Sequence, residues 1–251
     1  MRSVFFTNIG AVRTHNEDAL LSERVFSGEN MRDAQLMELK GNSIVVAVAD
    51  GVGGEPGGAE AAKCLLSALI ALNHQPFGAD ATSRLEDSII LGINDMARIS
   101  DKSPELTGMA TTVAGLWTDG EKALVFNCGD CRIYRFRQGF LEQLSKDHSV
   151  VYELYLSGDI TESEMQTHPR RHVLTSSIRD KGENPRVYLR ELSILKGDSY
   201  FLCSDGVWDS VPLKELEEIL ASAPPLQAAQ SLAERLLAIG TKDNSTFLWL
   251  M

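Results

Sequence analysis

Two kinds of hydrophobic pattern alternate along this chain. Short apolar runs, many rich in β-branched residues, have the length and composition of strands. We expect strands at residues 4–10, 19–21, 44–49, 186–192, 199–205 and 245–251. Longer segments place apolar residues three or four positions apart, which is the period of a helix with one buried face. We expect helices at residues 59–74, 83–100, 213–222 and 226–239, with Gly240 ending the last one.

The middle of the chain favours sheet. Residues 111–144 are rich in β-forming side chains and carry hairpin signals at residues 118–120 and 137–139. A polar loop is expected at residues 23–41, and a more polar stretch of helix and loop at about 151–180. Strands therefore often follow strands through tight turns, which favours antiparallel sheets with helices outside over a doubly wound parallel sheet. The pattern does not set the topology.

Composition narrows the class of protein. The chain has 251 residues, of which 43% are hydrophobic, so we expect one domain over residues 1–251 with a sizeable core. The net charge of −11 argues against nucleic acid or an anionic membrane as the main partner. No apolar run reaches the length of a membrane span, and the first residues lack the features of a signal peptide.

Four cysteines lie within apolar stretches: Cys64, Cys128, Cys131 and Cys203. This placement is typical of reduced, structural thiols, so we expect a cytoplasmic protein. Cys128 and Cys131 form a single C-x-x-C pair, and one such pair without a second is weak evidence for zinc.

Candidate chemistry is concentrated in carboxylates at strand ends. The runs IVVAVADGVGG and SYFLCSDGVWD stop at Asp50-Gly51 and Asp205-Gly206, where a buried strand would aim the carboxylate and a glycine would permit close approach. Glu17-Asp18 and Asp243-Asn244 also stand beside strand-like segments. Because no histidine or cysteine accompanies these residues, the expected ligand is a hard divalent cation.

Several of these features have plainer interpretations. A lone Asp-Gly pair usually marks a turn. Arg13, four residues before Glu17, is either a solvated side chain or a phosphate-binding guanidinium. His148 is either a general acid or a hydrogen-bonded structural group. The glycines after the strand at 44–49 do not form a dinucleotide-binding turn, because Pro56 stands where the third glycine is due.

Seven short motifs occur in the order and approximate spacing of PPM-type (type 2C) metal-dependent serine/threonine protein phosphatases: RTHNEDA, AVADGVGG, GMATTVAGL, NCGDCRIYRF, LSKDHS, LCSDGVWD and TKDNST. The chain resembles bacterial members of this family from Val4 to Leu250. The resemblance implies an α+β fold, a four-layer αββα sandwich in which two antiparallel sheets are flanked by helices. It also implies a flap subdomain at about residues 151–180.

The resemblance further implies a binuclear Mg²⁺ or Mn²⁺ centre. Asp50 resembles the ligand that bridges both ions, with Asp205 and Asp243 on one ion and Glu17 and the Gly51 carbonyl on the other. Asp18 is similar to an acid that orients a metal-bound water, and Arg13 to the phosphate-binding arginine. A third ion is implied at Asp130, Asp205 and Asp209.

The implied activity is hydrolysis of phosphothreonine or phosphoserine by metal-activated water, without a phosphoenzyme. The implied substrate is a phosphorylated protein, a target of a bacterial serine/threonine kinase or the kinase itself, and we expect a monomer. The alternatives are a pseudophosphatase that acts as a binding module and a metal hydrolase of small phosphate esters. The chain departs from the family at Val52, where some members have histidine, and in the flap at His172 and Arg179, where bacterial relatives usually have asparagine and glycine.

Overall fold

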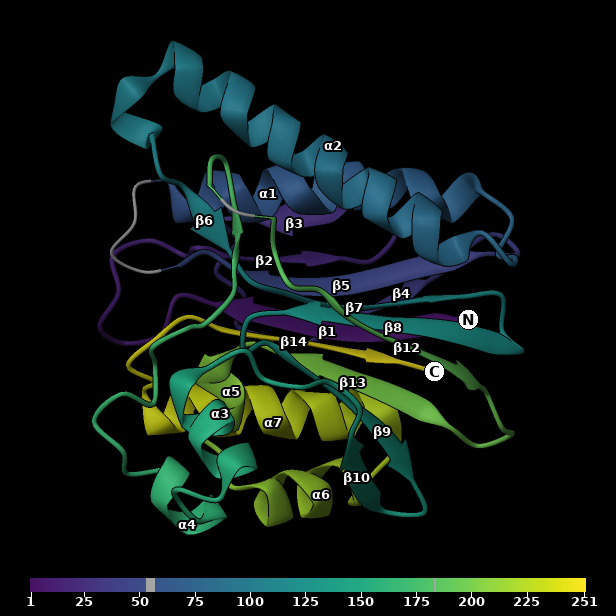
Figure 1. Cartoon of the computed structure of the whole chain (residues 1–251). Coiled ribbons are helices and arrows are strands. Elements are labelled where there is room, and N and C mark those ends of the chain that lie inside the picture. The colour runs from purple at the N-terminus through teal and green to yellow at the C-terminus, as the bar shows by residue number, and fades with distance from the viewer. Residues whose placement is uncertain (53–56, 183) are drawn as a thin grey trace.

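The computed structural model describes residues 1–52, 57–182 and 184–251 and shows two stacked sheets between layers of helices (Figure 1). The strands are β1 (Arg2–Asn8), β2 (Asp18–Leu21), β3 (Val25–Ser27), β4 (Gln35–Glu38), β5 (Ile44–Asp50), β6 (Ala110–Thr111), β7 (Val113–Thr118), β8 (Lys122–Cys128), β9 (Arg132–Arg137), β10 (Phe140–Gln143), β11 (Ile178–Arg179), β12 (Tyr188–Ser193), β13 (Ser199–Cys203) and β14 (Ser245–Leu250). The helices are α1 (Gly58–Leu69), α2 (Ala81–Lys102), α3 (Val150–Ser157), α4 (Glu162–Met165), α5 (Asp205–Trp208), α6 (Leu213–Ala221) and α7 (Pro225–Ile239), with 3₁₀ turns η1 (Ile70–His74) and η2 (Pro104–Leu106).

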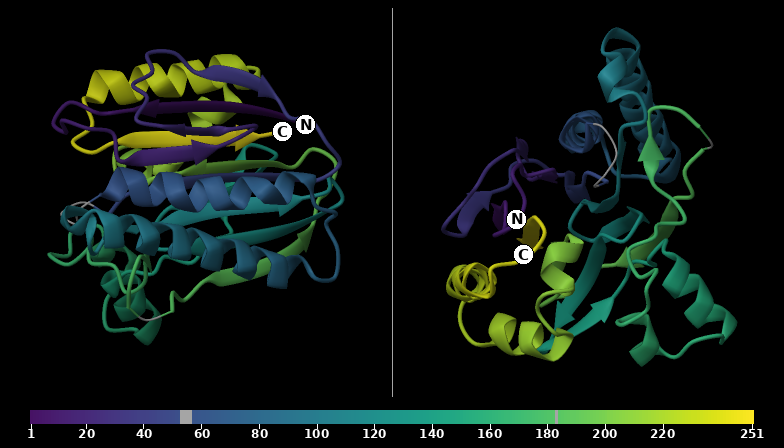
Figure 2. Two further views of the ribbon diagram at one scale, coloured as in Figure 1. Left: turned by 90° about the horizontal axis from the view of Figure 1, so that it is seen from above. Right: turned by 90° about the vertical axis from the view of Figure 1, so that its left-hand side faces the viewer.

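Each large sheet is antiparallel. One has the strand order β10-β9-β13-β14-β1-β4 and the other β12-β8-β7-β5-β2-β3, while β6 and β11 form a small separate pair. Helices α1 and α2 cover the second sheet, and α6 and α7 cover the first, as the views in Figure 2 also show. The expected four-layer αββα sandwich is confirmed.

Strand β5 shows why its sequence is a continuous apolar run. Ile44, Val46 and Val48 belong to the core between the two sheets. The alternate residues, Val45, Ala47 and Ala49, face the second core under α1 and α2. A strand alternates its side chains between two faces, so a strand buried on both faces needs apolar residues throughout. This double burial fixes where the strand ends, at Asp50.

Two sequence-based expectations are wrong in detail. Residues 23–41 are not all loop, because β3 pairs with β2 and β4 pairs with β1 at the edges of the two sheets. Strand β4 is largely exposed, so it carries no apolar alternation that the pattern could register. The strand expected to end at Asp205 ends at Cys203 instead, and Asp205 is the first residue of α5.

Other expectations agree with the structure. The stretch at 151–180 holds α3, α4 and β11 with connecting loops. All four cysteines are free and buried. Within the described residues, no helix is both long enough and apolar enough to cross a membrane. The glycine-rich turn after β5 lies largely outside the described residues, at 53–56.

Candidate functional site

Strand pairing in the second sheet places two carboxylates face to face. Asp18 begins β2 and Asp50 ends β5, and the two residues are directly opposite in the antiparallel register. Asp18 is buried. Glu17 precedes β2, and its carbonyl accepts a hydrogen bond of 3.2 Å from the Gly51 amide. This end of the second sheet therefore carries three acids within a few residues of one β-pair.

The first sheet contributes two more acids at the same end. Asp205 opens α5 just after β13, and Asp243 lies in the loop that leads into β14. The two segments are in close contact, because a Cβ atom added at Gly206 would lie 1.9 Å from the Asn244 carbonyl oxygen. Strand β14 in turn contacts β2 and β5 of the other sheet. Packing of the two sheets thus brings all five acids to one end of the sandwich.

The sequence suggested that the glycines after Asp50 and Asp205 let a ligand approach closely. The structure gives another reason for glycine at these two positions. A Cβ atom at Gly51 would lie 2.4 Å from the Gly58 carbonyl carbon. Both glycines after the aspartates are therefore required by the close approach of the chain's own backbone. Neither contact identifies a ligand.

Asn244 and Ser204 brace the acids. The Asn244 amide oxygen accepts a hydrogen bond of 2.8 Å from the Glu17 amide, and its amide nitrogen donates to the carbonyls of Ile9 and His15. The Ser204 hydroxyl donates to Asp18 Oδ2 at 2.7 Å and accepts from the Thr246 amide at 3.0 Å. Sequence analysis assigned neither residue a role. The Asp-Asn pair in TKDNST was the available signal for Asn244, and Ser204 gave none.

Arg13 reaches the acids from the loop after β1. Its Nη2 donates to Asp243 Oδ2 at 2.6 Å, and both side chains are more than one third exposed. This bond raises the pKa of Arg13, and the charges of Glu17 and Asp50 add to it. The guanidinium is therefore charged, at the surface and next to the carboxylates.

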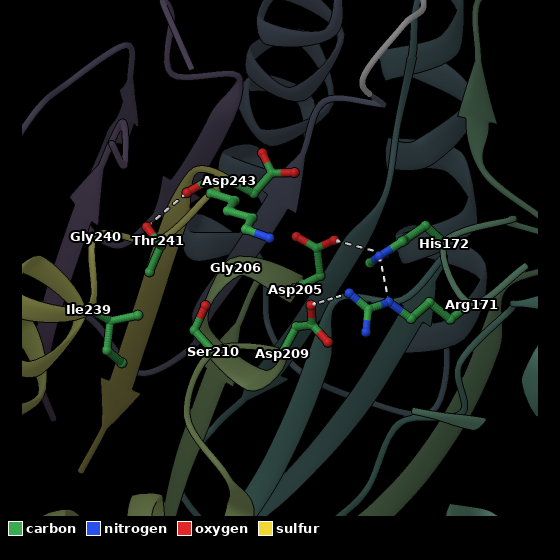
Figure 3. A pocket seen from close by; sticks show the side chains of 11 residues that line it. Arg171, His172, Asp205, Gly206, Asp209, Ser210, Ile239, Gly240, Thr241 and Asp243 are labelled. Carbon is green, nitrogen blue, oxygen red and sulfur yellow. Dashed lines mark hydrogen bonds and ion pairs between the residues drawn. The ribbon is translucent and has the colours of Figure 1, made fainter. Parts of the chain in front are cut away.

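Two basic side chains come from the stretch at 151–180. Arg171 Nη2 donates to Asp209 Oδ2 at 3.2 Å, and Arg171 Nε donates to His172 Nε2 at 2.8 Å. His172 Nδ1 lies 4.0 Å from Asp205 Oδ2. Figure 3 shows these side chains facing a pocket of about 370 Å³ that Asp205, Asp209 and Asp243 also line. Sequence analysis did not identify Arg171.

The remaining predicted acid, Asp130, is buried in the turn between β8 and β9. Burial raises its pKa well above the ordinary value, and the charge of Asp205 raises it further. Asp209 is exposed at the end of α5. Both residues therefore lie near enough to Asp205 to interact with its charge.

The acids perturb one another. Burial raises the pKa of Asp50 well above its ordinary value, and the charges of Asp18, Asp205, Asp130 and Asp243 raise it further. Burial likewise raises the pKa of Asp18 to about 7, although its hydrogen bond with Ser204 lowers it.

Burial raises the pKa of Asp205 to about 6, with a further contribution from Asp243, and burial also raises the pKa of Glu17. Such mutual repulsion favours either protonation or a bound cation.

Two of these carboxylates have an oxygen without a partner. Asp18 Oδ1 and Asp205 Oδ1 are buried and accept no hydrogen bond from the described residues. Among the described residues, no group of three or more histidine, cysteine, aspartate or glutamate side chains has the arrangement of a metal site. The unpartnered carboxylate oxygens nevertheless have the donor chemistry that suits a hard cation.

His148 is bonded to the turn that carries Asp130. Its Nδ1 accepts a hydrogen bond of 3.1 Å from the Gly129 amide, and its own amide donates to the Gly129 carbonyl at 2.8 Å. Burial lowers the pKa of His148. These bonds support the structural interpretation of His148, because Nδ1 is occupied by the backbone.

Comparison with known proteins gives consistent matches. A family model described as Protein phosphatase 2C matches residues 23–241. Serine/threonine protein phosphatase PstP of Mycobacterium tuberculosis is 31% identical over 237 residues, which are 94% of this chain and 42% of that protein. This chain thus spans less than half the length of that relative. Serine/threonine phosphatase stp of Listeria monocytogenes serotype 4b is 30% identical over 253 residues, 99% of this chain and 94% of that protein.

Solved structures show the same fold. The crystal structure of the Mycobacterium tuberculosis phosphatase PstP/Ppp has a TM-score of 0.83 and 28% identity, and the match covers 99% of this chain and 98% of that one. The catalytic domain of PstP in complex with two manganese ions has a TM-score of 0.79 and 27% identity, with the same coverage.

Proposed function

This chain belongs to the protein phosphatase 2C family, and on that premise we propose that it hydrolyses phosphothreonine and phosphoserine in proteins with the help of Mg²⁺ or Mn²⁺. One observation carries the proposal beyond family membership. Burial and the charges of Asp205 and Asp243, beside one sheet, raise the pKa of Asp50 in the other sheet, at the end of the sandwich where Arg13 bonds to Asp243. A phosphate ester needs both kinds of group, because cations must neutralise its oxygens and carboxylates must hold those cations.

The residues present fit divalent cations. Buried carboxylates repel one another, and the unpartnered oxygens of Asp18 and Asp205 are buried acceptors that hard cations prefer. The solved catalytic domain of PstP, which shares the fold, contains two manganese ions. When bound, such ions would supply charge that neutralises the phosphate and lower the pKa of the attacking water.

We assign each acid to one of the proposed ions from its position in the site. Asp50 would be shared by two ions, with Asp205 and Asp243 serving one, and Glu17 and the Gly51 carbonyl serving the other. Asp130, Asp205 and Asp209 would hold a third ion. Asp243 and Asp209 now accept hydrogen bonds from Arg13 and Arg171. Each guanidinium bonds only to Oδ2 of its aspartate, so a cation at Oδ1 would not have to displace it.

Arg13 has the chemistry to bind the substrate. Its planar guanidinium can donate two parallel hydrogen bonds to phosphate oxygens, which a lysine cannot do. It lies at the surface, within reach of a phosphorylated side chain, and keeps its charge because the pKa is raised by Asp243. On exchange from Asp243 to phosphate, Arg13 would orient the ester and stabilise charge that develops in the transition state.

Asp18 would act through water. The Ser204 hydroxyl holds Asp18 Oδ2 at 2.7 Å, and Asp18 Oδ1 is left as a buried acceptor that is not hydrogen bonded to the described residues. A carboxylate in this position can accept a hydrogen bond from the attacking water and orient it. Ser204 thus sets the direction of the Asp18 carboxylate.

The stretch at 151–180 is proposed as the flap that borders the substrate. Arg171 and His172 extend from it to Asp209 and Asp205, so that movement of this stretch changes access to the acids. The substrates proposed are phosphoproteins, including targets of a serine/threonine kinase or the kinase itself. A monomeric, cytoplasmic enzyme is part of the same proposal.

The decisive assay compares a phosphothreonine peptide with a small phosphate ester, each with Mn²⁺ and with excess EDTA. We expect metal-dependent hydrolysis of both, with the higher kcat/KM for the peptide. Asp50→Ala should remove both activities. Higher kcat/KM for the small ester would favour a small-ester hydrolase. Peptide binding without turnover at any Mn²⁺ concentration would favour a pseudophosphatase.

A further inference from the structure

Trp208 connects the two segments that carry the outer acids. It ends the short helix α5, which begins at Asp205 and is followed by Asp209. Its indole Nε1 donates a hydrogen bond of 3.0 Å to the backbone carbonyl of Asp130. One side chain thus links the turn between β8 and β9 to α5, although 78 residues of chain separate the two bonded groups.

The Trp208 ring is fixed by a buried ion pair. The Arg132 guanidinium carbon lies 3.7 Å from the ring centroid, a distance at which a cation is attracted to the face of an indole. Arg132 is in turn held by Asp147, which accepts from Nη2 at 2.7 Å and from Nε at 3.0 Å. Asp147 is only 6% exposed. The stack therefore restricts the Trp208 ring from the side of Arg132.

The turn that holds Asp130 is braced on its other side as well. The Asn127 amide donates to the Lys146 carbonyl at 2.7 Å, and Gly129 exchanges two hydrogen bonds with His148. These contacts fix the turn against the segment 145–148. Toward α5, Arg132 pairs with Cys203 between β9 and β13. The Trp208 hydrogen bond and the Arg132 stack add side-chain contacts between the turn and α5 itself.

We infer that Trp208 is a positioning residue that sets the separation of Asp130 from Asp205 and Asp209, and hence the affinity for the outermost cation. The inference rests on the proposed function, in which these three acids hold a third ion. A side chain that orients metal ligands changes metal affinity when it is altered, whereas one that only fills space changes stability. The two roles can therefore be separated by experiment.

The test variant is Trp208→Phe, which retains a ring for Arg132 and removes the indole N–H. Trp208→Tyr, which also lacks the indole N–H, is the second variant should the first not fold. The matched control is Trp249→Phe, because the buried Trp249 indole also donates one hydrogen bond, to Ser199 at 2.9 Å. The unfolding midpoints of wild type and of each variant measure how far each substitution lowers stability.

Two measurements report the metal. Calorimetric titration with Mn²⁺ gives the number and affinity of the ions bound, independently of activity. Hydrolysis of a phosphothreonine peptide against Mn²⁺ concentration gives the half-saturating concentration. For Trp208→Phe we expect unchanged tight binding, weakening of the weakest binding phase by roughly tenfold, and the same shift in the activity curve. Trp249→Phe should lower the unfolding midpoint and leave both metal measurements unchanged.

Three results would overturn the inference. Wild-type protein with no weak binding phase would leave no outermost ion for Trp208 to control. If Trp208→Phe and Trp249→Phe gave the same Mn²⁺ titration, Trp208 would be a packing residue only. Loss of tight binding in Trp208→Phe would assign it to the inner ions instead. Wild-type protein that binds Mn²⁺ but does not hydrolyse the peptide would count against the proposed function alone.

Discussion

Asp18 lies directly opposite Asp50 on the neighbouring antiparallel strand. Opposed residues in such a pair have Cβ atoms about 5 Å apart, and like charges in this position are destabilising. Arg13, from the loop after β1, hydrogen bonds to Asp243 beside the other sheet. The fold therefore places an electrostatic cost at the position where a bound cation would relieve it.

Replacing Asp50 shows whether the charge repulsion between the acids and the catalytic activity depend on the same residue. Asp50→Ala should abolish turnover, because it removes the ligand proposed to be shared by two ions. The metal-free variant should be at least as stable as wild type, because the remaining carboxylates lose a repulsive neighbour. Steady-state assays and urea unfolding measure the two effects. Asp101→Ala, which removes an exposed ion pair with Lys181, is the control. A variant that retained a tenth of wild-type kcat would show that the site is misplaced.

Metal removal should stop catalysis reversibly. The proposed ligands are oxygen donors, which bind Mg²⁺ and Mn²⁺ with modest affinity and release them to a chelator. Exhaustive EDTA treatment should abolish phosphopeptide hydrolysis, and Mn²⁺ should restore it. Added Mn²⁺ should also raise the melting temperature, because a ligand that binds only the folded state stabilises it. Asp50→Ala should show little of this increase. Activity that survives the chelator would rule out the metal mechanism.

Arg13→Ala tests the phosphate-binding role. A hydrogen bond from a charged group is worth roughly 1.5–3 kcal/mol, so kcat/KM should fall by about one to two orders of magnitude. Metal affinity should change little, because a guanidinium does not ligate cations. Stability should also change little, since the Arg13–Asp243 pair is more than one third exposed.

Arg84→Ala is the matched control for Arg13, because Arg84 forms an exposed pair with Asp80 on α2. It should leave kcat/KM unchanged. Equal kcat/KM for Arg13→Ala and wild type would return Arg13 to the role of a solvated side chain.

His148 should make stability depend on pH. Burial lowers its pKa in the folded protein, so between that value and about 6.5 the unfolded chain binds more protons. The contribution of His148 is therefore fully present above about pH 6.5 and is lost as the pH falls through this window. The variant His148→Asn keeps an acceptor near Nδ1 but does not titrate. Its unfolding free energy relative to wild type should improve from pH 7.5 to pH 5.5. A difference that is constant with pH would exclude this account.

Local sequence patterns predicted the parts of the fold that depend on local burial. The run from Ile44 to Asp50 is apolar because both faces of β5 are covered, and its abrupt end at a carboxylate was visible in the sequence. Strand β4 was missed because an exposed edge strand lacks apolar alternation. The short helix at Asp205 was missed because four residues are too few to show a helical period.

The partners of the acids were harder to predict than the acids themselves. Asp50, Asp205 and Asp243 stood out by their positions after apolar runs or beside Asn244. Ser204 and Trp208 act through contacts that only the packing of two sheets and a helix creates. Their neighbours in space are 186 and 78 residues away in the chain. Pairings over such distances leave no periodic signal in one sequence.

Asp50 belongs to one sheet, and Asp205 and Asp243 adjoin the other. The distances between these acids therefore depend on how the two sheets are aligned. Phe247 in β14 stacks between Phe6 and Phe201, with ring centroids 5.6 Å from each, and its backbone pairs with Cys203. A smaller side chain there would let β14 shift against β5 by a fraction of an ångström. Such a shift would change the unfolding free energy little. It would change the catalytic rate more, because catalysis depends on carboxylates from both sheets. A smaller side chain at Phe247 can therefore change this protein's activity while every proposed ligand remains in place.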